Sequence, residues 1–327
     1  IDMNKRSWQK LVAVLAISFV STSNQTEACA HARTGPGAKI PPAADPAPTI
    51  AKVDRPTEQV WSGQNSWTTE REAQYSAFIS TLGTKIAQNR CRTLAACLND
   101  PAVNPLPESF GRPLHFRADC ADVPYILRAY FSYVHDLPFR FTKEMVGTGR
   151  DARYYRNAQP KGVRTFRDFE TPRKLFEHLS SAVHSGFFRS THTVEESDFY
   201  QTQISRSAIR PGTMFYDPNG HVLVVYGLRP DGSVLTFDGH PDGSLTHGVL
   251  SERNQRGGES QGGGFKNFRP LRWDKELLAQ KRNQELADFG GGMQFDRTRY
   301  VVDGLPVSYH DWVRAQLQDR TAQAAAM

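Results

Sequence analysis

Residues 209–243 read IRPGTMFYDPNGHVLVVYGLRPDGSVLTFDGHPDG, and this stretch decides the fold. Two turn signals, DPNG at 217–220 and RPDG at 229–232, separate short apolar runs. Turn residues of this kind between apolar runs are typical of β-hairpins. The stretch therefore predicts three antiparallel strands, at residues 213–216, 221–227 and 233–238.

Helices are predicted on the N-terminal side of these strands. One begins near Thr69, because Thr69 and Glu72 have the spacing of a capping box. A second covers 123–134, where apolar side chains recur at helical spacing. A third covers 171–186, with an N-cap threonine and an N1 proline at its start and a glycine expected at its end. Helices and hairpin strands in separate parts of the chain predict the α+β fold class.

The remaining segments carry weaker signals. Segments 101–113, 141–165 and 251–264 are proline-rich, basic or glycine-rich and lack periodicity, so we expect loops there, and we expect 251–264 to be mobile. Extended segments are expected at 265–273 and 297–303, and a short helix is expected from Ser308.

Length and charge exclude some classes of protein. The 327 residues are ample for a packed core. The net charge of +6 suits anionic partners in general. Lys and Arg are dispersed and no recognition motif appears, so a nucleic-acid partner is not expected.

The first thirty residues have the pattern of an export signal. Basic residues precede an apolar stretch at 11–20, and Ala-Cys-Ala at 28–30 has the form of a signal-peptidase site. We expect residues 1–30 to be a signal peptide cleaved after Ala30, which places the mature chain in the periplasm or outside the cell. Residues 31–60 read as a Pro-rich linker. No other apolar run could span a bilayer, so stable membrane insertion after cleavage is not expected.

The four cysteines have different expected fates. Cys29 leaves with the signal peptide, and Cys91 and Cys97 are close enough to form a disulfide candidate. Cys120 is then an odd thiol in an oxidising compartment, and it lies at the predicted start of a helix. Backbone N–H groups and the helix dipole stabilise a thiolate at that position. The alternative is that Cys120 is simply a small buried apolar residue.

A histidine and an aspartate complete a candidate catalytic triad with Cys120. His221 opens one predicted strand, and Asp238 closes the next, at the same end of the hairpin. The alternative is a surface histidine and an unrelated turn aspartate. His240 is a second candidate for the orienting role, although we expect it to face the other way.

These residues resemble the papain-like cysteine hydrolases, in their NlpC/P60, CHAP and transglutaminase-like branches. The resemblance is carried by Asp119-Cys120 at the head of a helix, by RPGT at 210–213 before a strand, and by GHV at 220–222. It implies a papain-like core, in which the nucleophile helix packs on an antiparallel sheet. The single catalytic domain would be residues 61–327, with an inserted segment at 141–209 that shapes the cleft.

The resemblance also implies a chemistry. Cys120 attacks an amide carbonyl, His221 moves the proton, and Asp238 orients His221. The Cys120 N–H would be one oxyanion donor, and side-chain donors are sought among His115, Arg117 and Asn219. Peptidoglycan peptide is the expected substrate, with an envelope protein acted on by a transglutaminase-like protease or acyltransferase as the alternative. No cofactor is expected.

Two other readings compete with the thiol enzyme. A metal site is disfavoured because the polar residues fit no known ligand spacing; they are His221, Asp238, His240, Asp242 and His247. A cell-wall or polysaccharide-binding module without catalysis would use exposed aromatic residues, although core packing is their ordinary role. The aromatic candidates are Tyr154, Tyr155, Phe187 and Phe188.

Overall fold

The computed structural model describes residues 61–106, 110, 112–274, 276–319 and 321. The expected signal peptide and Pro-rich linker lie outside the described residues. Within the described ranges, helices and antiparallel strands are mixed, as the α+β class requires. No helix in these ranges is both long enough and apolar enough to cross a membrane.

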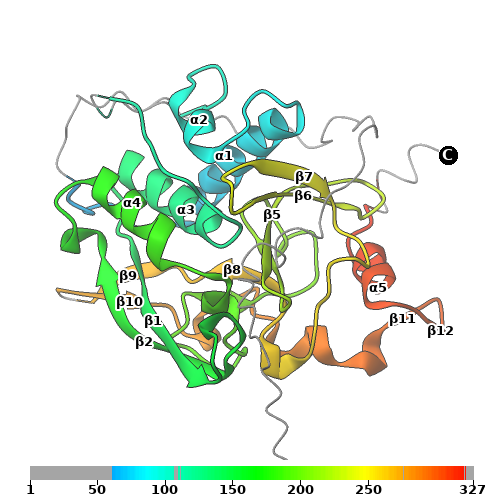
Figure 1. The fold of residues 1–327 in the computed structure, drawn as a ribbon. Helices are drawn as coiled ribbons and strands as arrows, with labels where there is room; N and C mark the ends of the chain where they lie inside the picture. The colour runs from blue at the N-terminus through cyan, green and yellow to red at the C-terminus, as the bar shows by residue number, and fades with distance from the viewer. Residues whose placement is uncertain (1–60, 107–109, 111, 275, 320, 322–327) are drawn as a thin grey trace, which may run out of the picture.

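The predicted strands form the middle of a six-stranded antiparallel sheet with the order β3-β8-β4-β5-β6-β7 (Figure 1). Its strands are β3 (Phe199–Gln201), β8 (Gly264–Phe268), β4 (Met214–Asp217), β5 (His221–Leu228), β6 (Val234–Gly239) and β7 (Leu245–Val249). The three strands predicted from turn chemistry are β4, β5 and β6, and each begins within one residue of its expected start. The edge strands β3 and β7 were not predicted.

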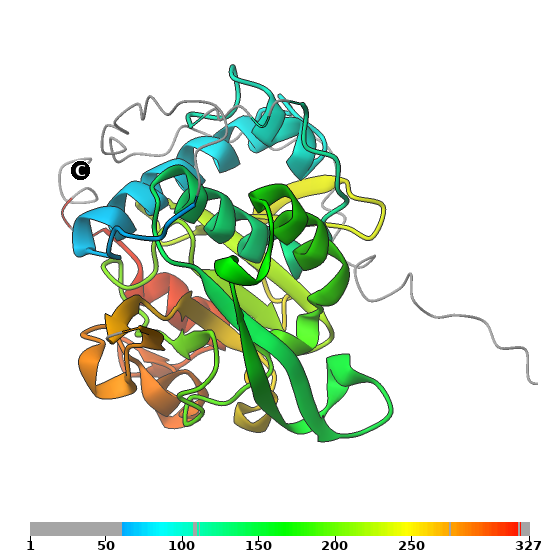
Figure 2. The ribbon, with the colours of Figure 1, turned by 90° about the vertical axis from the view of Figure 1, so that its left-hand side faces the viewer.

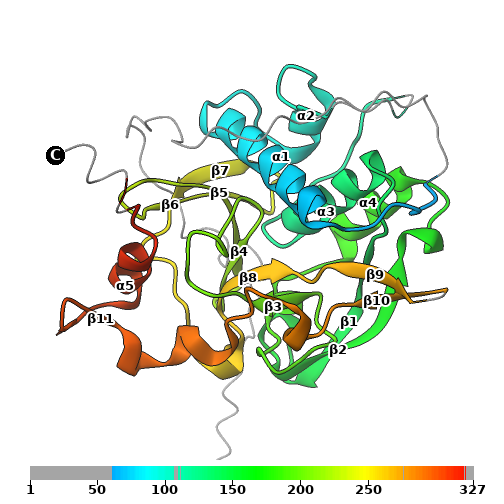
Figure 3. The same ribbon diagram turned by 180° about the vertical axis from the view of Figure 1, so that it is seen from behind.

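Helices cover the two faces of this sheet unequally. They are α1 (Thr69–Ala87), α2 (Leu94–Asn99), α3 (Asp122–Val134), α4 (Pro172–Ala182) and α5 (Tyr309–Gln316). Val222 and Val224 of β5 belong to a large core with α1, α3 and α4, whereas Leu223 and Val225 belong to a smaller core with α5. This follows from the alternation of side chains along a strand. Figure 3 shows α5 on the far side of the central strands from α1 and α3.

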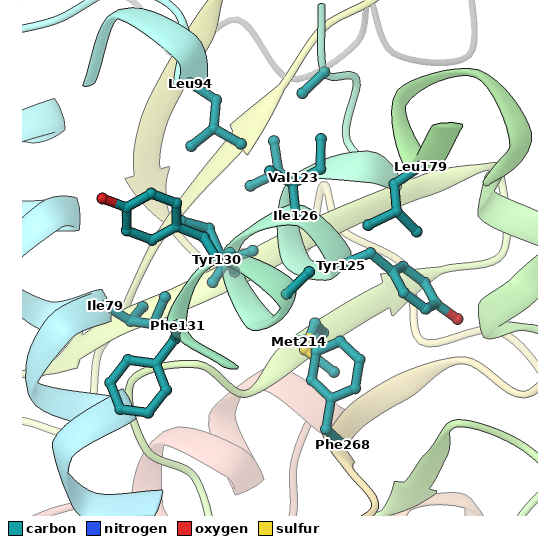
Figure 4. Packing of buried hydrophobic residues seen from close by; sticks show 14 of the residues in the cluster. Ile79, Leu94, Val123, Tyr125, Ile126, Tyr130, Phe131, Leu179, Met214 and Phe268 are labelled. Atoms are coloured by element: carbon teal, nitrogen blue, oxygen red, sulfur yellow. The ribbon is translucent and has the colours of Figure 1, made fainter. Parts of the chain in front are cut away.

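Helix α3 is buried along its whole length. The sequence predicted one apolar face, but the helix lies between the sheet, α1 and α4, so its polar face is covered too. Figure 4 shows its side chains Val123, Ile126 and Tyr130 surrounded by residues from other elements. A helix that is enclosed in this way holds its N-terminal end in one place.

The expectation of irregular structure at 141–165 was wrong. Strands β1 (Arg140–Thr148) and β2 (Arg156–Thr165) form an antiparallel hairpin, the long green ribbon in Figure 2. Phe141, Met145 and Ala158 are buried on one side, but exposed basic and glycine residues interrupt the pattern. The apolar alternation that would have revealed the strands is therefore too sparse to read from sequence.

Shorter elements complete the described chain. They are η2 (Ala152–Tyr154), η3 (Phe166–Asp168), η4 (Ser185–Phe188), η5 (Glu259–Gln261), β9 (Leu271–Asp274), β10 (Leu277–Gln280), η6 (Asn283–Glu285), η7 (Gly291–Phe295), η8 (Arg297–Arg299), β11 (Val301–Val302) and β12 (Leu305–Pro306). The expected extended segment at 297–303 is thus mostly a 3₁₀ turn with a two-residue strand. The short helix expected from Ser308 is α5, and Ser308 caps it.

Two predicted helix ends need correction. The N-cap of α1 is Thr68, whose Oγ1 accepts the Arg71 N–H at 3.2 Å. The sequence could not decide which of two adjacent threonines takes the extended conformation of a cap. Helix α4 ends at Ala182, because Val183 turns to an extended conformation. Gly186 has another role, since a Cβ there would lie 2.3 Å from the Ala152 carbonyl oxygen.

The segment 251–264, expected to be mobile, has specific contacts. The Gln255 N–H donates to Asp217 Oδ2 at 2.9 Å, and Gln201 Nε2 donates to the Gly263 carbonyl at 2.9 Å. Gly262 and Gly263 fit close to other backbone, and this steric role cannot be distinguished from flexibility in the sequence alone.

Cys91 and Cys97 form a disulfide, with their Cα atoms 5.2 Å apart. Cys97 lies on α2, and Cys91 lies in the turn after α1, so the bond joins the ends of two consecutive helices. The disulfide candidate is therefore present in the structure.

An ion pair between the buried Arg128 and the partly buried Glu72 joins α1 to α3. Arg128 donates to both carboxylate oxygens of Glu72, at 2.6 and 2.9 Å. Its guanidinium carbon lies 3.3 Å from the centre of the Trp67 ring, and its side chain is only 4% exposed. This bidentate pair fixes α3 against α1, because removing either partner would leave a charge buried alone.

We predict that Glu72→Gln lowers the free energy of unfolding by about 3 kcal/mol, because Arg128 keeps its charge and loses its carboxylate. Glu70→Gln is the matched control, since Glu70 is exposed in the same first turn; it should cost less than about 0.5 kcal/mol. Urea unfolding of both variants measures the difference. Equal, small effects would show that the pair does not anchor α3.

Candidate active site

The start of α3 is fixed by a reciprocal pair of aspartates. Asp119 Oδ1 accepts the N–H groups of Ala121 and Asp122 at 2.8 and 3.2 Å, and Asp122 Oδ2 accepts the Asp119 N–H at 2.9 Å. Cys120 lies between these residues, directly before the N-cap Ala121. The prediction that Cys120 lies at a helix start is confirmed, and this position favours negative charge.

The Cys120 thiol is buried against the end of strand β5. Cys120 is 2% exposed, and its Sγ donates to the Gly220 carbonyl oxygen at 3.7 Å. Gly220 ends the turn between β4 and β5 and has a φ of 100°, which favours glycine. The fold therefore places the thiol against Gly220, the residue directly before the candidate base His221.

A second glycine lets α3 approach strand β6. A Cβ on Gly239 would lie 2.8 Å from the Ala118 carbonyl oxygen and 2.9 Å from the Asp119 carbonyl oxygen. Gly239 directly follows Asp238 in the chain. The start of α3 therefore packs on two glycines at adjacent strand ends, beside His221 and Asp238.

His221 and Asp238 meet as the hairpin predicted. His221 Nε2 lies 3.1 Å from Asp238 Oδ2, and the two side chains are 6% and 5% exposed. They are held at the same end of the paired strands β5 and β6. A buried histidine beside a buried carboxylate is the orienting arrangement that a general base needs.

Strand alternation defines the side from which the thiol approaches. Val222 faces α1 and α3, so its neighbour His221 faces the opposite side of the sheet. Phe237 also faces α1 and α3, so its neighbour Asp238 faces the same side as His221. The His–Asp pair therefore lies on the side of Leu223, toward the α5 core. Cys120 belongs to the α3 side, and so it approaches His221 around the end of β5, at Gly220.

A second carboxylate flanks His221 and was missed in the sequence. Asp217 of β4 is paired with His221 across the turn and is 6% exposed. Burial raises the pKa of the Asp217 carboxyl, although the N–H groups of Asn219 and Gln255 and the nearby His221 oppose that rise. The sequence assigned Asp217 only to a turn. A tight turn places the residue before the turn opposite the residue after the turn. The turn signal at 217–220 could therefore have indicated that Asp217 lies beside His221.

The expectation that His240 faces away from Asp238 was wrong. His240 Nε2 lies 3.4 Å from Asp238 Oδ2 and 2.9 Å from Thr246 Oγ1. Residues two apart along a strand share a face, so His240 follows Asp238 to the same side. His240 therefore belongs to the site.

The proposed oxyanion side chains are not gathered at the thiol. His115 and Arg117 are exposed on the segment before α3. Asn219 is also exposed; its backbone N–H donates to Asp217 Oδ1 at 3.0 Å, and its carbonyl accepts the Tyr154 hydroxyl at 3.2 Å. The structure gives none of these side chains a contact that supports the donor role.

The segment 141–209 covers the turn before His221. Tyr154 in η2 reaches Asn219, and Arg189 donates to the carbonyls of Tyr155 and Pro218, at 2.8 and 3.2 Å. Phe187 and Phe188 are buried, so core packing accounts for them, whereas Tyr154 is 38% exposed. The predicted insertion thus lies next to the site.

A small cavity of about 30 Å³ adjoins Asp238 on the side away from α3. It is about the share of liquid volume that one water molecule occupies. Its lining residues are Leu223, Thr236, Asp238, His247, Gly248, Val249, Ser251, Arg253 and Asn254. Among the described residues, no group of His, Cys, Asp and Glu side chains is arranged to hold a metal ion.

The site thus combines a buried thiol at a helix start with a buried His–Asp pair at the adjoining strand ends. A scan of family models, a search of curated proteins and a search of solved structures each returned no match.

We predict that Gly239→Ala lowers the free energy of unfolding by about 1–3 kcal/mol, because the added methyl group pushes the start of α3 away from β6. The matched control is Gly258→Ala, where the nearest atom to the new Cβ is 3.5 Å away. Thermal or urea unfolding compares the two. If Gly239→Ala were as stable as the control, close packing of α3 on β6 would be refuted.

Proposed function

We propose that the chain is an exported cysteine hydrolase of papain-like type that cleaves an amide bond by acyl transfer on Cys120. One observation carries the proposal. The Cys120 thiol, at the start of a buried helix, contacts the residue that precedes His221, and His221 lies 3.1 Å from the buried Asp238. This arrangement supports Cys120 as the nucleophile, His221 as the base and Asp238 as the orienting carboxylate.

The proposed reaction has two stages. Cys120 passes its proton to His221, and the thiolate attacks the amide carbonyl carbon to form a C–S bond. His221 returns the proton to the departing amine as the C–N bond breaks, leaving an acyl-enzyme. Water or a second amine then gives a proton to His221 and attacks the thioester carbonyl carbon. The C–S bond breaks, and Cys120 regains the proton from His221. The Asp238 carboxylate stabilises the imidazolium form of His221 in both stages.

The helix start restricts which N–H groups stabilise the oxyanion. The N–H groups of Ala121 and Asp122 already donate to Asp119. We propose the Cys120 N–H as one oxyanion donor, because it belongs to the nucleophile itself.

Peptidoglycan peptide is the substrate we propose. The export signal predicted at 1–30 would bring the mature chain to the cell wall. The mature chain keeps a net charge of +5 of the total +6, because residues 1–30 hold three basic and two acidic side chains, and this positive charge suits an anionic polymer. The second candidate within the class is a transglutaminase-like protease or acyltransferase that acts on an envelope protein. The choice between hydrolysis and transfer depends on whether water or an amine reaches the acyl-enzyme.

One observation favours a different function, a wall- or polysaccharide-binding module without catalysis. Cys120 is 2% exposed and belongs to the main apolar core, as a structural cysteine would. A binding module needs no reactive thiol, so removal of the thiol separates the two functions.

We predict that Cys120→Ala lowers the rate of cleavage of purified peptidoglycan or casein by at least about 10³-fold, because the nucleophile is lost. His178→Ala is the control, since His178 lies on α4 in contact with Phe141 and Phe169; it should keep its rate. Undiminished cleavage by Cys120→Ala would exclude the nucleophile. Binding of peptidoglycan without cleavage by either the native chain or the variant would support the binding module instead.

A further inference from the structure

The Asp238 carboxylate contacts three side chains. Oδ2 lies 3.1 Å from His221 Nε2 and 3.4 Å from His240 Nε2, and Oδ1 accepts the Thr246 hydroxyl at 2.9 Å. The last two residues also contact each other, with His240 Nε2 2.9 Å from Thr246 Oγ1. Only the His221 contact is needed for a Cys-His-Asp triad.

The protons in this network can be assigned from the contacts. Thr246 has one hydroxyl proton, and that proton is donated to Asp238. Toward His240, Thr246 Oγ1 can therefore only accept, so His240 Nε2 carries a proton. An ionised carboxylate only accepts hydrogen bonds. His240 Nε2 thus donates to Thr246, while His221 Nε2 lies 3.1 Å from Asp238 Oδ2.

The Asp238 carboxylate also acts on His221. Because a carboxylate 3.1 Å from Nε2 favours a proton on that nitrogen, we infer that the neutral His221 ring has its basic nitrogen at Nδ1. Nδ1 is then the atom that would take the thiol proton. Since Thr246 and His240 hold the carboxylate in place, they determine how firmly His221 is kept in this tautomer.

We propose that His240 and Thr246 are positioning residues, which orient Asp238 and through it keep His221 in the Nε2–H form. This inference deepens the proposed function and rests on it for its catalytic meaning. The two imidazole rings are nearly parallel, with centroids 6.3 Å apart. Because one carboxylate serves both rings, a positive charge on His240 opposes a positive charge on His221.

Other charged or titratable groups face this network. Asp217 flanks His221 from β4, and Asp242 interacts with His240 from the turn after β6. His247 and Arg253 line the cavity beside Asp238. Cys120 approaches from the start of α3.

The test is the ¹⁵N NMR signature of the His221 ring across pH, in the native chain and in Thr246→Val. The native chain should show the Nε2–H tautomer, and Thr246→Val should show a mixture of tautomers with a shifted titration. Thr246→Ser keeps the hydroxyl and should restore the native spectrum. Thr236→Val, a buried threonine on β6, is the control for the loss of a hydroxyl.

Kinetics supply the second readout on the active chain. Thr246→Val and His240→Ala should lower kcat about tenfold to a hundredfold with little change in KM, and both should shift the pH profile. His240→Gln, which can still donate to Thr246, should recover most of kcat.

The two proposals fail in different ways. An identical His221 spectrum in the native chain and in Thr246→Val would overturn the positioning role, whatever the activity. If the spectrum changes as expected but the native chain cleaves no amide substrate, the positioning role stands and the proposed hydrolase fails.

Discussion

The packing of the start of α3 against two strand ends is the constraint on which the rest of the site depends. Gly239 gives the helix room, because any Cβ there would overlap the carbonyl oxygens of Ala118 and Asp119. Gly220 supplies the carbonyl that accepts the Cys120 thiol. On the other side, the Arg128–Glu72 pair and the complete burial of α3 prevent the helix from moving away. The positions of the thiol and of the His–Asp pair follow from these contacts.

The sequence predicted the middle of the central sheet because turn chemistry is a local property. DPNG and RPDG place β4, β5 and β6, and the same hairpin brings His221 and Asp238 to the same end of adjacent strands. Residue patterns failed where the structure depends on contacts distant in the chain. The β1–β2 hairpin has few apolar positions, and Asp217 becomes a neighbour of His221 only through strand register. His240 was assigned the wrong side although the period of two was enough to place it correctly.

The structure also divides the proposed site between two sides of the sheet. Cys120 packs with the α3 core, whereas His221 and Asp238 lie on the side of Leu223. The thiol contacts the Gly220 carbonyl, directly before His221, where the chain turns into β5. Segment 141–209 contacts that turn through Tyr154 and Arg189.

The pH dependence of Cys120 alkylation by iodoacetamide tests the central claim most directly. The chain should carry Cys29→Ser, and Cys91 and Cys97 are paired, so Cys120 is the thiol that reacts. We expect the alkylation rate to rise with a pKa well below about 8.5, and His221→Ala to move that pKa upward, because the imidazolium stabilises the thiolate. A pKa at or above about 8.5 that His221→Ala leaves unchanged would show that Cys120 is a core residue and that the chain is not a thiol hydrolase.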